Sequence, residues 1–145
     1  MRQDQFYIKR LVALGDEKVQ IGDDRHLIID GTRLDATTPH FENVYSFDPK
    51  VPPRKDFFYS GHVNQHTATE YHLLDDVGNP LYVGQYFPDQ DKVYTVPSNH
   101  YMVMGDNTLN SSDSRYWGDF SCTNVIGRYF CVYWPVSKRI GWTVR

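Results

Sequence analysis

The stretch "HLIIDGTRL", residues 26–34, has the pattern of a β-hairpin. A short apolar run leads into Asp30 and Gly31, and a second short run follows them. An Asp-Gly pair between two strand-like runs is among the strongest local indications of a tight hairpin turn. We therefore predict a hairpin over residues 27–34, and this prediction anchors the fold.

The segments on both sides of the hairpin also have strand character. Upstream, "FYIKRLV" (6–12) is apolar and aromatic, and a Gly15-Asp16 turn separates it from the alternating "KVQI" (18–21). No window keeps apolar residues at helical spacing behind a capping residue. The 11 Tyr, 8 Phe and 3 Trp also favour strands. Further strand-like runs follow downstream, in "VYTVPSNHYMVMGDN" (93–107), "NVIGRYFCVYWPV" (124–136) and "GWTV" (141–144).

The length of 145 residues and the 40% hydrophobic content suit one domain with its own core. Between about residues 38 and 92, prolines and short aromatic runs alternate with polar turns. We expect a mainly β domain over residues 1–145. Its core would come from 1–37 and 93–145, with a variable β insertion at about 38–92.

The charge pattern excludes some partners. The net charge is −3 and neither sign forms a run, so nucleic acid is not expected as a partner. No run of 18 apolar residues and no signal-peptide pattern occurs, so we expect these residues neither to span a membrane nor to direct their own export.

The cysteines and histidines give only weak indications. Cys122 and Cys131 are compatible with a disulfide or with two small buried apolar residues. His62 and His66 have the i, i+4 spacing of a helical zinc clamp, but "GHVNQHTATEYH" has no Glu after the first His and no amphipathic pattern. We expect exposed loop histidines and no metal or organic cofactor.

Two polar features stand out against this background. Lys9 and Arg10 lie inside an apolar run, and neighbouring strand residues point to opposite faces. One of the two therefore points inward unless both extend into water from an edge strand. A buried Arg must be paired, and a desolvated Lys that loses its proton can act as a general base. The loop "GDNTLNSSDSRYWG" (105–118) is the second feature, and it could be a hydrogen-bonded turn or a functional loop.

Taken together, "FYIKRLVALGD", "GDNTLNSSDSRYWG" and "NVIGRYFCVYWP" closely resemble the motif segments of type I signal peptidases. The resemblance covers about residues 6–19 and 96–135. It implies a fold of coiled antiparallel β-sheets with an inserted β subdomain and little helix. It also implies a serine endopeptidase with a Ser-Lys dyad.

The resemblance assigns roles to six residues. Lys9 would be the general base, and the Ser111 hydroxyl would orient its amine. Arg10 is expected to pair with Asp113, with Asp106 as a second candidate partner, and so to brace the loop against the strand that carries Lys9. Arg115 is expected in the same network.

The sequence departs from the family pattern in three places. Thr108 and Leu109 stand where the family has Arg-Asp, and "ALGD" replaces a "GLPGD" turn. No serine occurs among the eight residues before Lys9, although the family's nucleophile lies upstream of its lysine. "SFDP" (46–49) has a similar form but would require a permuted topology. We expect a truncated chain that lacks the serine motif and the membrane anchor and does not cleave peptides alone.

The resemblance further implies a place and partners for the intact protein. It would cleave signal peptides from preproteins exported by Sec-type machinery, at the outer face of the bacterial cytoplasmic membrane. Part of its aromatic surface would contact lipid. The alternative is a non-catalytic peptide-binding or scaffold module of the same fold. A self-cleaving repressor-type domain also uses Ser-Lys chemistry, but the polar loop argues against it.

Overall fold

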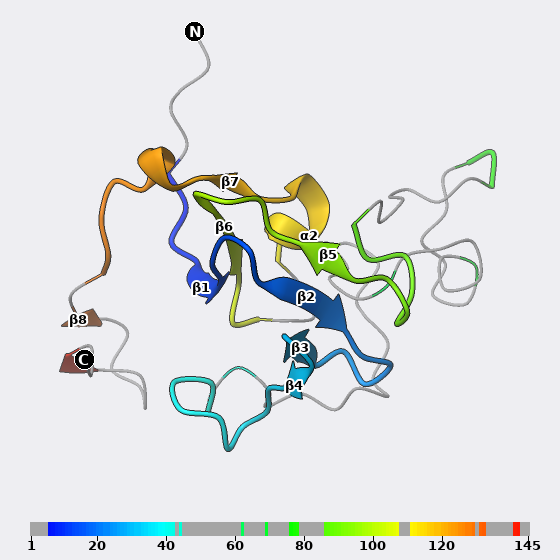
Figure 1. Ribbon diagram of the computed structural model, residues 1–145, viewed down its shortest axis with the longest axis horizontal. Helices are drawn as coiled ribbons and strands as arrows, with labels where there is room; N and C mark the ends of the chain where they lie inside the picture. The colour runs from blue at the N-terminus through cyan, green and yellow to red at the C-terminus, as the bar shows by residue number, and fades with distance from the viewer. Residues whose placement is uncertain are drawn as a thin grey trace, which may run out of the picture.

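The structure is a computed structural model that describes residues 6–42, 44, 62, 69, 76–78, 86–107, 111–129, 131–132 and 141–142. Most of the expected insertion at 38–92, including "SFDP" and His66, lies outside the described residues. The described part is mainly β, as predicted, and its strands form antiparallel sheets (Figure 1).

A three-stranded sheet connects the two predicted parts of the site: Lys9 directly precedes its first strand in the chain, and the polar loop follows its second. Its order is β1-β6-β7, with β1 at Arg10–Ala13, β6 at His100–Met104 and β7 at Phe120–Ser121. Arg10 pairs with Met104, so the start of β1 lies beside the end of β6. The predicted strand over residues 6–12 is wrong at its start: residues 6–9 are not in a strand, and Lys9 directly precedes β1.

A four-stranded sheet contains the predicted hairpin. Its order is β4-β3-β2-β5, from Thr32–Arg33, Leu27–Ile29, Lys18–Ile21 and Tyr94–Thr95. The hairpin is confirmed, because β3 and β4 pair directly across the two-residue turn. Asp30 and Gly31 have φ values of 48° and 80°, the positive pair that an Asp-Gly turn supplies at low cost.

Buried side chains from both sheets form one core. Val19 and Ile21 of β2 meet Met102 and Met104 of β6, and all four are at most 3% exposed. Their alternation along each strand matches the two-residue period of a sheet with one buried face. The same cluster includes Ala13, Leu27, Phe87 and Val96.

A polar contact also joins the two sheets. The Tyr94 hydroxyl on β5 donates to the carboxylate of Asp119, which immediately precedes β7. Burial and this hydrogen bond both raise the pKa of Tyr94, so the hydroxyl remains a donor to Asp119 even above the pH at which a free tyrosine ionises. The loop that ends at Asp119 is thus tied to the second sheet.

The remaining elements are short. They are α2 (Ser114–Trp117), the 3₁₀ helix η1 (Cys122–Asn124) and the paired strands β8 (Cys131–Val132) and β9 (Gly141–Trp142). The predicted strand over 124–136 is wrong in its first part, because residues 125–129 are not in a strand. Within the described residues, no helix is long and apolar enough to cross a membrane.

Candidate functional site

Lys9 and Ser111, 102 positions apart in sequence, meet at the junction of β1 and the polar loop. The Lys9 Nζ donates a hydrogen bond to Ser111 Oγ over 2.9 Å. Ser111 is buried, whereas Lys9 is only partly buried and its Nζ also lies 5.9 Å from the centroid of the Tyr7 ring. The structure therefore brings the two residues of the predicted catalytic pair into direct contact.

Asp113 forms a hydrogen bond with the Ser111 side chain and is itself fully buried. Arg115 pairs with its carboxylate: Nε donates to Oδ1 at 2.9 Å and Nη2 donates to Oδ2 at 2.5 Å. Burial acts to raise the pKa of Asp113. The positive charge and hydrogen bonds of Arg115 outweigh it, helped by the Gly105 amide and the Ser111 hydroxyl, and the pKa of Asp113 is lowered. Asp113 is thus an ionised acceptor.

The direction of these hydrogen bonds argues against Ser111 as the nucleophile. The Ser111 oxygen accepts from Lys9, and its hydroxyl interacts with the Asp113 carboxylate, which is acceptor-only when ionised. A nucleophilic serine would instead donate its proton to the lysine amine. The geometry fits Ser111 as a residue that orients the amine.

Arg10 pairs with the second of its two predicted partners, Asp106, and not with Asp113. Its Nε and Nη2 donate to the two carboxylate oxygens of Asp106 at 2.7 and 3.0 Å. The expected pairing of Arg10 with Asp113 is wrong, because Asp113 is engaged by Arg115. The hydrogen bonds to Asp106 raise the pKa of Arg10, which keeps the pair charged. Two separate ion pairs therefore brace the loop.

The short helix α2 explains why the loop can hold Asp113 in place. Asp113 is its N-cap and accepts from the backbone N–H of Arg115 at 3.2 Å. The next residue, Ser114, is also buried, and its Oγ accepts from the Val103 amide of β6 at 2.9 Å. Gly118 ends the helix at a φ of 82°, where a Cβ would collide with the Tyr86 ring.

Sequence reasoning did not identify two residues that shape the site. Gly105 gives its amide to Asp113 Oδ2 at 2.9 Å, and a Cβ there would overlap Ser111. Ser114 fixes α2 to β6. The pattern of Asp113 before a short run that ends at Gly118 could have indicated a capped helical turn. Thr108 and Leu109, the departures from the family pattern, lie outside the described residues.

The other titratable candidates contribute nothing to this site. The prediction of an exposed loop histidine is wrong for His62, which is buried and bonded through Nε2 to the Ile21 carbonyl at 2.8 Å. Cys122 is a free thiol and is half-buried. In the described ranges, no three His, Cys, Asp or Glu side chains gather in a way that could hold a metal ion.

Several known proteins are similar to this chain. Signal peptidase I of Pseudomonas fluorescens is 28% identical over 144 residues, covering 91% of this chain and 45% of the relative. Signal peptidase I of Aquifex aeolicus (strain VF5) is 30% identical over 145 residues, covering 88% of this chain and 56% of the relative. The chain thus spans about half the length of these relatives.

A solved structure and a family profile also match. The crystal structure of a signal peptidase I from Enterococcus faecalis V583 is 28% identical, with a TM-score of 0.48, and covers 83% of this chain and 80% of that chain. The profile of the family described as "Signal peptidase, peptidase S26" matches residues 1–134, which include all six predicted site residues. The chain belongs to the signal peptidase family, peptidase S26.

Proposed function

We propose that Lys9 is the general base of a Ser-Lys dyad that removes signal peptides from exported preproteins. The hydrogen bond from Lys9 Nζ to Ser111 Oγ is the observation that supports this role most directly. A neutral amine that donates one N–H to Ser111 keeps its lone pair available in another direction. That lone pair can accept the proton of a serine hydroxyl.

The serine itself is expected before Lys9, as in the family resemblance, and none occurs among residues 1–8. In the proposed reaction Lys9 takes the serine proton as the serine oxygen attacks the scissile carbonyl carbon. The proton then passes to the leaving amine, and an acyl-enzyme remains. Water, deprotonated by the same amine, releases the new carboxyl end. No step needs a metal or an organic cofactor.

The substrate is proposed to bind as an added strand next to Lys9. Residues 6–9 belong to no strand of the described sheets, and Phe6 and Ile8 are 71% and 85% exposed. An extended peptide can pair with backbone of this kind, and the main-chain bonds would place its scissile bond beside the lysine. Small side chains near the cleaved bond are expected from the family resemblance.

The test compares two lysines in the product of the native gene, including any residues encoded before Met1. We expect this protein to cleave a preprotein at its signal peptide. Lys9→Met should lower the cleavage rate by about 10²- to 10⁴-fold, the usual contribution of a general base. Lys18→Met is the matched control, because Lys18 is an exposed lysine of β2. Cleavage that survives Lys9→Met would exclude Lys9 as the base.

The 145-residue chain provides the second arm of this test. It is expected to show no cleavage, because the proposed nucleophile is not among its residues. Cleavage by this chain that disappears in Lys9→Met would show that a nucleophile does lie within it. A native gene product that binds signal peptides without cleaving them would instead support the scaffold alternative.

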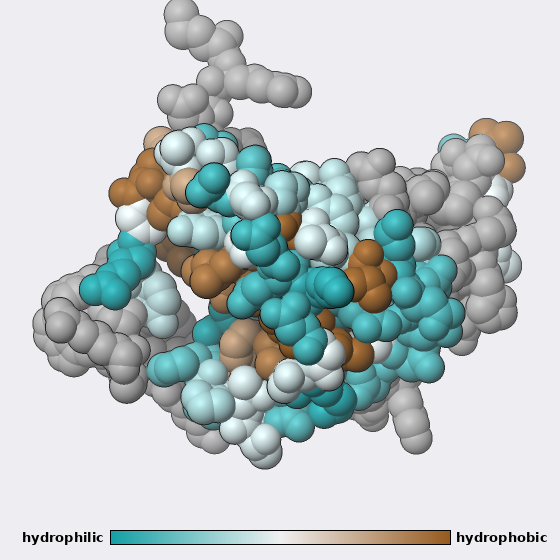
Figure 2. Space-filling view, viewed as in Figure 1, coloured by the Kyte–Doolittle hydropathy of each residue, from teal (hydrophilic) through white to brown (hydrophobic). Residues whose placement is uncertain are grey.

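We also propose that the protein works at the outer face of the cytoplasmic membrane, with apolar side chains in contact with lipid. Ile126 and Tyr129, in the segment after η1, are 80% and 52% exposed. The apolar residues before Lys9 are also exposed. Figure 2 shows brown, apolar surface at the upper left, around η1.

Vesicle flotation tests this surface. The chain should float with vesicles that mimic a bacterial inner membrane, because exposed apolar and aromatic side chains gain free energy at the lipid boundary. Ile126→Ser together with Tyr129→Ser should lower the bound fraction several-fold. Val77→Ser is the control, since Val77 is 85% exposed but lies outside this surface. Equal binding of all variants would contradict the assignment.

A further inference from the structure

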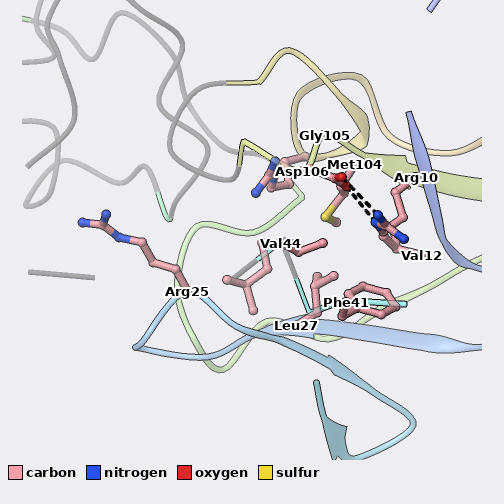
Figure 3. Close-up of a pocket in the computed structure, with 11 residues that line it drawn as sticks. Arg10, Val12, Arg25, Leu27, Phe41, Val44, Met104, Gly105 and Asp106 are labelled. Carbon is pink, nitrogen blue, oxygen red and sulfur yellow. Dashed lines mark hydrogen bonds and ion pairs between the residues drawn. The ribbon is translucent and has the colours of Figure 1, made fainter. Parts of the chain in front are cut away.

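The ring of Phe41 covers the side chain next to the proposed base. Phe41 lies in the loop after β4, and the Arg10 Cζ stands 5.3 Å from the centroid of its ring. Figure 3 shows the Arg10 guanidinium between Asp106 and the Phe41 ring. An arginine over an aromatic face is attracted by the ring quadrupole, and the attraction grows when the site excludes water.

The loop that carries Phe41 is held by its own hydrogen bonds. The Phe41 amide donates to the Thr38 carbonyl at 2.9 Å, and the Phe41 carbonyl accepts from the Val44 amide at 3.0 Å. The Asp35 amide donates to Thr38 Oγ1 at 3.0 Å. Phe41 also packs against the core cluster. The ring is therefore fixed in place rather than free to leave Arg10.

The Phe41 ring limits the space into which the Arg10 side chain could move, because both residues line one small cavity. Phe41, Arg10, Gly105 and Asp106 are among its lining residues, and its volume is about 10 Å³. This volume is at most enough for one water molecule and is far below the several hundred Å³ of a ligand pocket. Without the Phe41 ring, this space would be larger and the Arg10 side chain could swing into it and leave Asp106.

Arg10 and Lys9 make adjacent contacts between the same two segments. Arg10 pairs with Asp106, and Lys9 bonds Ser111. A Cβ built on Gly105, the residue before Asp106, would lie 3.5 Å from Lys9 Nζ, so the two contacts are close in space. A change in the first contact can therefore move the backbone that carries the second.

We propose that Phe41 is a positioning residue of the lysine site: its ring keeps the Arg10 guanidinium on Asp106 and thereby holds the Lys9 amine on Ser111. The inference deepens the proposed function, on which its catalytic meaning rests. Its structural content can be tested without any peptide cleavage.

The test measures how fast each lysine amine of the folded 145-residue chain is acetylated by trace N-hydroxysuccinimidyl acetate, read by mass spectrometry. The readout is the rate at Lys9 divided by the rate at Lys18, an exposed reference on β2. Because Lys18 is exposed in the folded chain, its rate corrects for reagent concentration and pH but not for unfolding, so each variant is measured under conditions in which urea unfolding shows it to be fully folded. Ser111→Ala frees the Lys9 amine directly and sets the upper limit of the effect.

Phe41→Leu keeps an apolar side chain of similar size but removes the ring. It should raise the Lys9 to Lys18 ratio about 2- to 5-fold, the equivalent of an arginine–aromatic contact. Phe41→Tyr keeps the ring and should leave the ratio at the wild-type value. A wild-type ratio in Phe41→Leu, or an equal rise in both variants, would overturn the proposal. Failure of the native gene product to cleave preproteins would overturn the proposed function and leave this ratio unaffected.

Discussion

Replacing Asp113 with asparagine is expected to lower the free energy of unfolding by about 3–5 kcal/mol, the cost of removing one partner from a buried ion pair. The side chain of Arg115 is only 5% exposed and forms an ion pair with Asp113. The substitution would remove the Asp113 charge from beside the buried guanidinium. The loss exceeds that of one hydrogen bond, because solvent cannot replace the carboxylate.

Asparagine also has the wrong donors for this site. Both Asp113 oxygens accept N–H groups: Oδ1 from the amide and Nε of Arg115, and Oδ2 from Arg115 Nη2 and the Gly105 amide. An asparagine amide supplies one oxygen and one NH₂ group, so its NH₂ would face other donors. The interaction with the Ser111 hydroxyl would weaken as well. Ser111 would then be less firmly placed to accept the hydrogen bond from Lys9.

Urea unfolding of the 145-residue chain measures the loss, and Asp24→Asn is the matched control. Asp24 pairs with Arg33 at the surface, where both side chains are at least 40% exposed. Exposed pairs contribute about 0–1 kcal/mol, so the control should change stability by no more than that. Equal losses in the two variants would contradict the assignment of Asp113 as a buried structural anchor.

The same pair predicts how stability depends on acid. The pKa of Asp113 in the folded chain is lowered, because Arg115 and the hydrogen bonds outweigh burial. A lowered carboxyl pKa contributes stability above its ordinary value of about 3.9, and this contribution is lost as the pH falls through the folded pKa. Asp113→Asn lacks it at every pH. The gap in unfolding free energy between wild type and variant should therefore be full at pH 7 and shrink below about pH 4. A gap independent of pH would contradict this account.

The sequence indicated the β fold and the local hairpin because both depend on local chemistry. The Asp30-Gly31 turn needs two positive φ angles that this pair adopts readily, and the flanking residues complete the pattern. The start of β1 could not be predicted in the same way. Residues 6–9 are as apolar as a strand, but a strand also needs a pairing partner, and β6 pairs only from Arg10 onward.

The structure brings the six residues together at one loop, but which of them would pair was not predictable from the sequence. Arg10 could reach either Asp106 or Asp113 from sequence alone, since both follow β6 in the same loop. The capped turn of α2 decides between them, because it points Asp113 toward Arg115 and leaves Asp106 for Arg10. Nothing in the sequence indicated a role for Phe41, because its contact joins a loop residue to the first residue of β1, far away in the chain.

Replacing Gly105 with alanine is expected to break the Lys9–Ser111 contact and to cost about 1–3 kcal/mol of stability through overpacking. The added Cβ would overlap Ser111 Oγ and lie 2.8 Å from Ser111 Cβ. Ser111 is buried, so it can move away only by giving up its bond to Lys9. Urea unfolding should show the loss, and the acetylation ratio of Lys9 to Lys18 should rise. Gly127→Ala is the control, because nothing lies within 4 Å of a Cβ at that position.

A compensating change separates this steric effect from a general weakness of the loop. Ser111→Gly removes the two atoms with which the alanine would collide, so the double variant Gly105→Ala with Ser111→Gly should be more stable than the sum of the single losses predicts. We expect a coupling of about 1 kcal/mol or more, as for residues in direct contact. Lys9 should remain as readily acetylated as in Ser111→Gly alone, because the hydroxyl that holds it is absent. Additive losses in the double variant would mean that Gly105 and Ser111 do not touch, and the geometry of the lysine site would then be wrong.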